Sequence, residues 1–153
     1  MTIKSATAII MFITACITIR PISSLGQSHP KSVQITRGAD GQKIVYGKAT
    51  HYSRSLDGTK TAIGTRYRNS KLTAASNFFK LRTWVRVTRL SNGKSVTVYI
   101  NDRMHRSMAS KGRIIDLSVA AAEKLHFMGP AGITRVKVEE IPENVAVSVN
   151  DND

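Results

Sequence analysis

Acidic residues are scarce in this chain, whose 153 residues include 10 Asp and Glu against 23 Lys and Arg. The single cysteine, Cys16, cannot form an intramolecular disulfide, so the fold has to be held together by its core. The only long apolar run covers residues 6–19, which is too short to span a bilayer comfortably. With so few carboxylates to place, an aspartate at the end of an apolar segment is a candidate for a chemical role.

The first 26 residues are typical of a secretory signal. Lys4 gives a short positive region, residues 6–19 give the apolar region, and small residues precede a cleavage site after Gly26. The segment Ile-Thr-Ala-Cys that ends at Cys16 also fits a bacterial lipobox, in which residues 1–15 are removed and Cys16 carries a lipid. The apolar run continues past Cys16, which argues against the lipobox, and both interpretations stay open. Both predict export to the bacterial cell envelope, as a periplasmic protein or as a membrane-anchored lipoprotein.

The strong positive charge restricts the kind of partner. The formal net charge is +13, and removal of Lys4 and Arg20 with the signal lowers it to +11. Nucleic-acid binding is the usual meaning of such a charge, but export argues against it. Among envelope polyanions, a glycan strand of peptidoglycan stripped of its peptides carries a lactyl carboxylate on every second sugar, so a basic groove suits it. The alternative is that the charge serves solubility and loose surface binding only.

The chain divides into three parts after the signal. Residues 27–43 are polar and contain two glycines, which predicts a linker. Residues 44–141 show short β-type runs separated by turn signals, enough for a single domain with one core. Residues 142–153 end in Asn-Asp-Asn-Asp and are expected to be a disordered tail.

Within the domain the patterns predict strands with few helices. Residues 44–52 and 133–141 read as strands, and Asn92-Gly93 predicts a hairpin between 84–90 and a strand with alternating Val96, Val98 and Ile100, since both turn positions favour positive φ. Ser118 is placed to cap an alanine-rich helix that continues through Met128. Short strands with one or two small helices favour a compact, mainly β barrel.

Several short motifs carry a family resemblance. They are Gly47-Lys48-Ala49-Thr50-His51-Tyr52, Thr61-Ala62-Ile63-Gly64, Leu72-Thr73-Ala74-Ala75, the run from Val85 to Val96, Asn101-Asp102-Arg103, and the run from Arg113 to Ser118. Their order and spacing over about residues 45–141 resemble the rare lipoprotein A family of endolytic peptidoglycan transglycosylases. The resemblance implies a six-stranded double-psi β-barrel, related to the expansin and barwin-like barrels. It also implies a lyase that cleaves the MurNAc–GlcNAc bond of peptide-stripped strands during wall remodelling or septation.

A lytic transglycosylase needs only one carboxyl group. As an acid, that group protonates the leaving glycosidic oxygen. As a base, it then takes the proton of the muramyl C6 hydroxyl, and a 1,6-anhydro ring closes without an activated water. The acid has to start protonated near pH 7, which requires a pKa raised by partial burial.

Position separates two aspartates from the other acidic residues, which fall in the linker, the tail, a turn, the last strand or an exposed helix face. The resemblance makes Asp102, in the Asn-Asp-Arg motif, the catalytic candidate. Asp116 matches an aspartate in the cleft of expansins and endoglucanases, and it is the second catalytic candidate. The alternative for Asp116 is a cap that leads the helix together with Ser118.

Two positions depart from the family pattern. The family has Glu directly after the Thr-Ala-Asn-Gly turn, where this chain has Thr65, and His after Leu-Thr-Ala-Ala, where this chain has Ser76. His105 is either a spatial replacement for that imidazole or a solvated loop residue. The losses leave open a slow enzyme, a shifted substrate, or a non-catalytic, expansin-like barrel that only binds peptidoglycan.

The expected substrate contacts surround the two aspartates. Arg103 and Arg113 are candidates to clamp lactyl carboxylates or to hold an aspartate ionised, unless they are solvated rim charges. The resemblance adds Tyr52 as a stacking platform for a sugar, and Asn101 belongs to the same motif as Asp102. Trp84 begins a strand and is expected in the core. The four histidines show no ligand spacing, so no metal and no cofactor are expected, and we expect a monomer that meets a membrane only through an N-terminal lipid.

Overall fold

The computed structural model describes residues 32–150 of the chain, with side chains described as far as Ala146. The predicted signal and Cys16 lie outside the described residues. Within the described range, no helix combines the length and the apolar character that crossing a bilayer requires.

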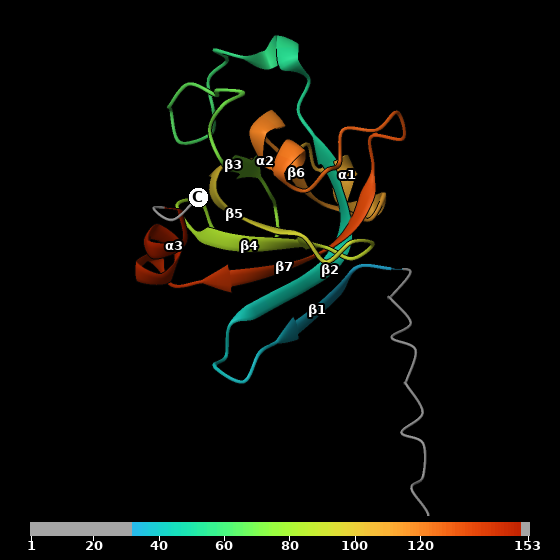
Figure 1. Ribbon diagram of the computed structural model, residues 1–153, viewed down its shortest axis with the longest axis vertical. Helices are drawn as coiled ribbons and strands as arrows, with labels where there is room; N and C mark the ends of the chain where they lie inside the picture. The colour runs from blue at the N-terminus through green and yellow to red at the C-terminus, as the bar shows by residue number, and fades with distance from the viewer. Residues whose placement is uncertain (1–31, 151–153) are drawn as a thin grey trace, which may run out of the picture.

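Six strands close into a barrel (Figure 1). In hydrogen-bonding order they are β2 (Lys43–His51), β6 (Arg113–Leu117), β3 (Thr73–Ala75), β5 (Ser95–Asp102), β4 (Trp84–Arg89) and β7 (Thr134–Ile141). Pairing of β7 with β2 closes the ring, and the two parallel pairs are β2 with β6 and β3 with β5. This closed, mixed sheet confirms the predicted six-stranded barrel with short helices.

The barrel core follows the predicted alternation. Val85 and Val87 on β4 and Val136 and Val138 on β7 are fully buried, while the residues between them on each strand are half-buried. The fully buried members of the core cluster all lie between Val45 and Val138. The buried residues of this cluster therefore fall within residues 44–141, where the sequence predicted the domain.

The hairpin between β4 and β5 forms where predicted, but with a different turn. Gly93 has φ of 71°, whereas Asn92 is not in the positive-φ region. The Asn92 side chain instead accepts a hydrogen bond from the backbone N–H of Lys94 and donates to the carbonyl of Leu125. The glycine alone supplies the left-handed residue, and the asparagine fastens the turn to the loop after the second helix.

The predicted helix after Ser118 forms but ends earlier than expected. Helix α2 covers Val119–Lys124, and the Ser118 hydroxyl caps it by accepting a hydrogen bond from the N–H of Ala121. His126 adopts φ of 53°, which no helix allows, so the chain leaves the helix before Met128. The other short helices are α1 (Ser107–Ser110) and the 3-10 helix η1 (Arg54–Leu56).

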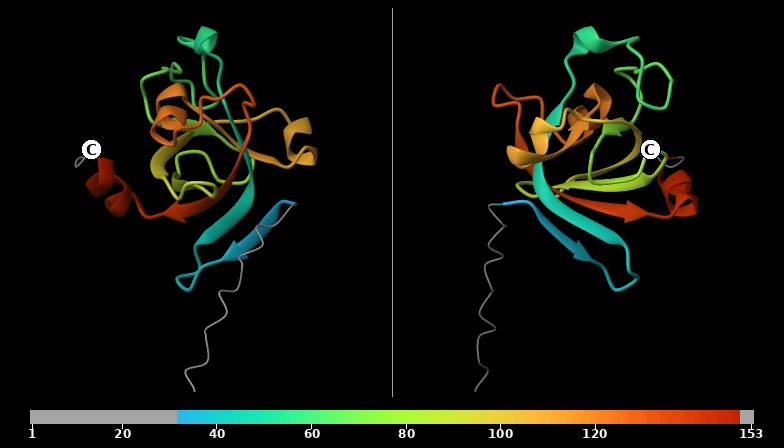
Figure 2. Two further views of the ribbon diagram at one scale, coloured as in Figure 1. Left: turned by 45° about the vertical axis from the view of Figure 1, so that its right-hand side comes forward. Right: turned by 180° about the vertical axis from the view of Figure 1, so that it is seen from behind.

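Two boundaries predicted from composition are wrong. Strand β1 (Gln34–Arg37) lies inside the predicted linker and pairs antiparallel with β2, so the two project from the barrel as a hairpin (Figure 2). All four β1 residues are exposed, so no apolar alternation marked the strand. Helix α3 (Glu143–Asn150) occupies most of the predicted disordered tail and lies against β4 and β5.

Candidate active site

The two candidate aspartates lie in one row across the barrel wall. Ala75 on β3 pairs with Asp102 on β5 on one side and with Asp116 on β6 on the other, and Asp116 pairs in turn with Thr50 on β2. Two strand spacings separate the aspartates, so their Cα atoms are about 10 Å apart. We call these four positions, Asp102, Ala75, Asp116 and Thr50, the carboxylate row.

Three donors hold the Asp102 carboxylate. The Tyr52 hydroxyl donates to Oδ2 at 2.9 Å, and the backbone N–H groups of Ala62 and Arg103 donate to Oδ1 at 2.9 and 2.8 Å. Ala62 belongs to the Thr-Ala-Ile-Gly turn, which closes through a bond from the N–H of Gly64 to the carbonyl of Thr61. The motif that resembled the family's turn therefore serves to position Asp102.

Tyr52 contacts Asp102 through its hydroxyl and Tyr67 through its ring. Its ring is half-buried and meets the edge of the Tyr67 ring, with centroids 4.6 Å apart. Burial first, and then the negative charge of Asp102, raise the pKa of the Tyr52 phenol well above its usual value. The phenol therefore stays a hydrogen-bond donor to Asp102 throughout the physiological pH range. Stacking of a sugar on the Tyr52 ring stays a prediction.

Asp116 has a cationic partner and a different environment. Its side chain is 15% exposed, and Arg113 donates to Oδ1 at 2.7 Å while also donating to the Thr50 hydroxyl. Burial raises the pKa of Asp116, against the opposing effects of Arg113 and of the His51 imidazole. Because Ser118 caps α2 with its own hydroxyl, the alternative of Asp116 as a helix cap is wrong.

Two predicted substrate-binding residues, Arg103 and Asn101, do not stand free at the surface. The Arg103 guanidinium donates to the backbone carbonyls of Ser76 and Phe79, so it fastens the loop after β3 rather than standing free above the aspartates. Asn101 is only 5% exposed, and its contact with a substrate stays a prediction. Its Oδ1 atom has no hydrogen-bond partner among the described residues.

The residues that depart from the family pattern form hydrogen bonds within the fold. The Thr65 hydroxyl contacts the Thr61 hydroxyl at 2.9 Å within the turn, and the buried Ser76 hydroxyl donates to the carbonyl of Ile114 at 2.7 Å. His105 is exposed and pairs with the Ser107 hydroxyl, the loop role that was one of its two interpretations. Among the described residues, no hydrogen bond joins these three side chains to either aspartate.

Sequence reasoning missed several contributors. His51, which packs against the Phe127 ring, influences the pKa of Asp116, and Thr50 shares Arg113 with that carboxylate. Both belong to the motif that contains Tyr52, so that motif was the available signal for them. In the described part of the chain, no group of three or more His, Cys, Asp and Glu is arranged to hold a metal ion.

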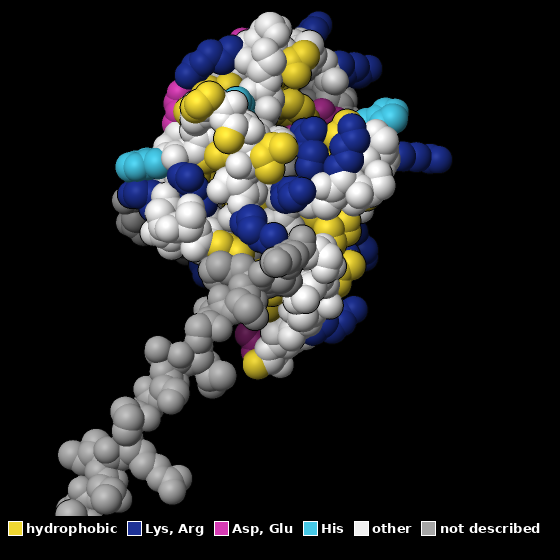
Figure 3. Space-filling model, turned by 90° about the vertical axis from the view of Figure 1, so that its right-hand side faces the viewer, with side chains coloured by type: hydrophobic (Ala, Val, Ile, Leu, Met, Phe, Trp, Pro, Cys, Tyr) yellow, Lys and Arg dark blue, Asp and Glu magenta, His cyan; other side chains and the backbone are white. Residues whose placement is uncertain are grey.

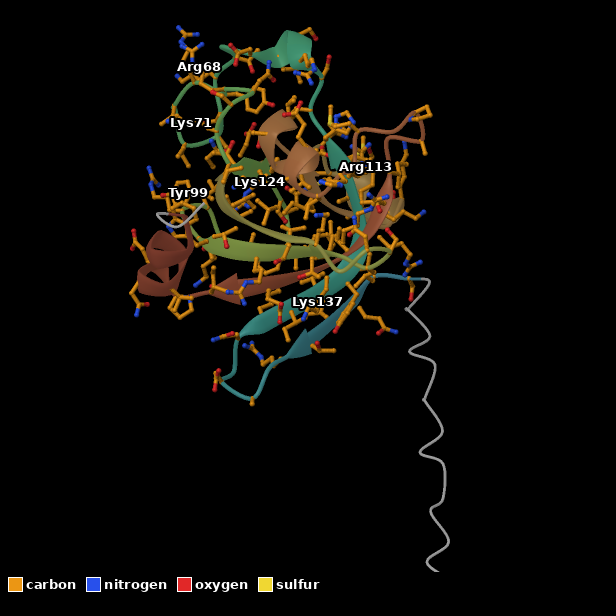
Figure 4. All side chains as sticks on the ribbon, in the orientation of Figure 1. Arg68, Lys71, Tyr99, Arg113, Lys124 and Lys137 are labelled. Carbon is orange, nitrogen blue, oxygen red and sulfur yellow. The ribbon has the colours of Figure 1, made fainter. Side chains whose placement is uncertain are left out.

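Trp84 is not a core residue. It is half-buried and its ring lies 5.0 Å from that of Tyr99, centroid to centroid. The two rings line an open groove of about 520 Å³ with Leu72 and Thr73. Tyr99 and Arg113 appear on different sides of the barrel in Figure 4, so this groove is separate from the Arg113 side of the site.

Comparison with known proteins agrees with the fold and the motifs. A family model described as lytic transglycolase matches residues 44–138. The endolytic peptidoglycan transglycosylase RlpA of Neisseria meningitidis serogroup A is 41% identical over 106 residues, covering 69% of this chain and 43% of the relative. The RlpA protein of Pseudomonas aeruginosa is 45% identical over 95 residues, covering 62% of this chain and 27% of the relative.

The chain thus spans less than half the length of these curated relatives. Among solved structures, the Streptomyces papain inhibitor superposes with a TM-score of 0.51 at 22% identity, covering 65% of this chain and 94% of that one. At that identity the likeness shows the fold alone.

Proposed function

This chain belongs to the lytic transglycolase family, and we propose that it is an endolytic peptidoglycan transglycosylase of the cell envelope. The observation that carries the proposal is the carboxylate row, in which two strands place Asp102 and Asp116 on either side of Ala75. The relatives named above, which act on peptidoglycan by their names, support the substrate class. Cell-wall glycan strands are therefore the proposed substrate, and the envelope is the proposed location.

The different environments of the two aspartates suggest different roles. Asp116, whose pKa burial raises, is the proposed acid that protonates the glycosidic oxygen of the leaving sugar. Asp102, held by three donors in one orientation, is the proposed base. Two strand spacings, about 10 Å between Cα atoms, leave room for a reacting sugar between them.

The proposed reaction needs no water. The bond between muramyl C1 and the glycosidic oxygen breaks as that oxygen takes the proton of Asp116. The muramyl C6 oxygen then bonds to C1, and its proton passes to Asp102. Exchange with solvent restores both groups, and the products are one chain with a new 4-hydroxyl and one with a 1,6-anhydromuramyl end.

The test is a product analysis. Residues 27–153 are incubated with peptide-stripped glycan strands, and mass spectrometry identifies the new ends, beside the Asp102→Asn and Asp116→Asn variants. Anhydromuramyl ends that disappear in both variants support the proposal. Reducing ends in place of anhydro ends indicate a hydrolase instead.

A non-catalytic, wall-binding barrel is the second candidate. It is favoured by Thr65 and Ser76, which stand where the family has Glu and His and whose hydroxyls contact Thr61 and Ile114 instead of Asp102. If no product forms while the protein still sediments with the strands, this second function replaces the first.

A further inference from the structure

A second row of paired residues crosses the barrel wall beside the carboxylate row. Tyr99 on β5 pairs with Thr73 on β3 on one side and with Trp84 on β4 on the other. These three residues belong to the open groove of about 520 Å³ described above. We call this groove, which is lined by Lys71, Leu72, Thr73, Trp84, Tyr99 and Glu143, the aromatic groove.

A bulge in β5 turns Tyr99 and Asp102 to the same face of the wall. The pairing of β5 with β3 shifts register after Ile100, so Asn101 is an extra residue in β5. Tyr99 and Asp102 are both half-buried, whereas the two residues between them are buried. In a regular strand, residues three apart point to opposite faces, and the extra residue of a bulge corrects this.

The aromatic groove is continuous with the carboxylate row. Thr73 precedes Ala75 by two residues on β3, and Tyr99 precedes Asp102 by three on β5, so the two rows are about 7 to 10 Å apart. Arg113, by contrast, lies on the other side of the barrel (Figure 4). A polymer that passes Asp102 along β5 therefore meets the aromatic rings next.

The polar groups of the groove have no partner in the described part of the chain. There, no hydrogen bond engages the Tyr99 hydroxyl or the Trp84 indole N–H, and neither Lys71 nor Glu143 forms an ion pair. Tyr and Trp that combine an apolar ring with an unpaired polar end are enriched at interfaces. A concave surface with such a lining and a few polar groups is typical of a ligand site.

The charge of the groove favours an uncharged ligand. Lys71 and Glu143 are both exposed and contribute one charge of each sign, so the lining is neutral in sum. The Arg113 side of the molecule differs, because Lys and Arg side chains there far outnumber Asp and Glu (Figure 3). An anionic group is attracted to that side instead. The groove suits a neutral ligand that has an apolar face and a polar edge.

We propose that the aromatic groove is a second binding site for the glycan strand, and that it holds uncharged N-acetylated sugars by stacking them on Tyr99 and Trp84. This inference rests on the proposed function for the class of its ligand. The C–H faces of the sugars cover the aromatic rings, and their hydroxyl and acetamide groups meet the unpaired polar groups. Continuity with Asp102 means that one strand occupies both the groove and the carboxylate row.

The fluorescence of Trp84 provides the test, because the chain contains one tryptophan and this residue lies in the groove. The full chain with Asp102→Asn, which prevents turnover, is the parent for the titrations. The probes are chitin oligosaccharides, which carry N-acetylated sugars without a lactyl carboxylate, and polyglutamate, an anionic chain without sugars.

Three variants of this parent separate stacking from other effects. Tyr99→Leu removes the ring but keeps apolar bulk, and Tyr99→Phe keeps the ring. Tyr46→Leu is the matched control, because Tyr46 is also a half-buried strand residue but lies on β2, outside the groove. Circular dichroism verifies that each variant is folded.

We expect chitin oligosaccharides to change the Trp84 fluorescence of the parent and polyglutamate to leave it unchanged. Tyr99→Leu should bind the sugar about three- to tenfold more weakly, whereas Tyr99→Phe and Tyr46→Leu should bind like the parent. An equal response to polyglutamate, or equal losses in Tyr99→Leu and Tyr46→Leu, would overturn the proposal. So would an unresponsive parent, which decides the matter even where Tyr99→Leu does not fold.

Failure of the proposed function gives a different result. If the chain with Asp102 intact yields no anhydromuramyl ends, the enzyme is refuted, yet a response to chitin that depends on the Tyr99 ring still establishes the sugar site. If that chain cleaves strands while chitin leaves the Trp84 fluorescence of the parent unchanged, the enzyme stands and the groove proposal falls.

Discussion

The carboxylate row and the aromatic groove differ in how their polar groups are satisfied. In the carboxylate row each aspartate has its donors in place: Tyr52 and two backbone N–H groups for Asp102, and Arg113 for Asp116. In the groove, the hydroxyl and the indole N–H of the two aromatic rings have no partner within the described part of the chain. The first arrangement is that of a site organised before the substrate arrives. The second is that of a surface whose missing partner is a neutral polar ligand from outside the chain.

The largest expected effect comes from replacing the two aspartates of the carboxylate row. Asp102→Asn and Asp116→Asn should each lower kcat on stripped strands by about 10²- to 10⁴-fold, because each amide keeps the shape but can no longer exchange the proton. Mass spectrometry of anhydromuramyl ends measures the loss. Tyr46→Leu should retain kcat, and a double aspartate variant no slower than either single would show that the two act as one unit.

Next in size is the positioning effect of Tyr52. Tyr52→Phe keeps the ring against Tyr67 but removes the hydroxyl that donates to Asp102, so kcat should fall roughly tenfold while KM changes little. Thermal unfolding provides the control, because a loss of stability large enough to unfold the chain would mimic the effect. A change in KM alone would instead support Tyr52 as the stacking platform.

A smaller effect should appear in the pH profile. Burial raises the pKa of Asp116 and Arg113 opposes the rise, so removing the arginine should raise that pKa further. If Asp116 is the acid, it then stays protonated to higher pH, and the alkaline limb of kcat/KM in Arg113→Gln moves to higher pH. Arg103→Gln is the matched control, since its guanidinium contacts backbone carbonyls instead. An unmoved limb in Arg113→Gln would assign the acid role to another group.

The sequence predicted the barrel better than the site. Alternating valines and the Asn-Gly turn depend on local physics, and the strands formed at or near the predicted positions. Asp102 and Asp116 were found because carboxylates are rare and both end short apolar segments. That Ala75 would bring them into one row depends on non-local pairing of β3 with β5 and β6, which no local pattern encodes.

Non-local contacts also explain why the sequence did not separate the roles of the two arginines. Arg103 and Arg113 both flank an aspartate in the sequence, yet one fastens a loop and the other contacts Asp116. The aromatic groove was missed for a related reason: the predicted hairpin brings Trp84 opposite Tyr99, but β3 and the start of α3, which line the groove with them, come from outside the hairpin. The sequence therefore placed Trp84 in the core.

The smallest effect concerns stability, and it separates the two regions most directly. Tyr99→Leu removes a ring that contacts Trp84, so without ligand it should lower the free energy of unfolding by about 0.5 to 1.5 kcal/mol. Saturating chitin oligosaccharide should then stabilise the Asp102→Asn parent by about 0.7 to 1.4 kcal/mol more than it stabilises Tyr99→Leu, because a ligand that binds three- to tenfold more weakly stabilises the folded state by that much less. Chemical denaturation with and without the sugar measures both differences, with Tyr46→Leu as the control. Equal stabilisation of the parent and Tyr99→Leu would mean that the sugar binds at the carboxylate row alone, since only the groove contains the Tyr99 ring.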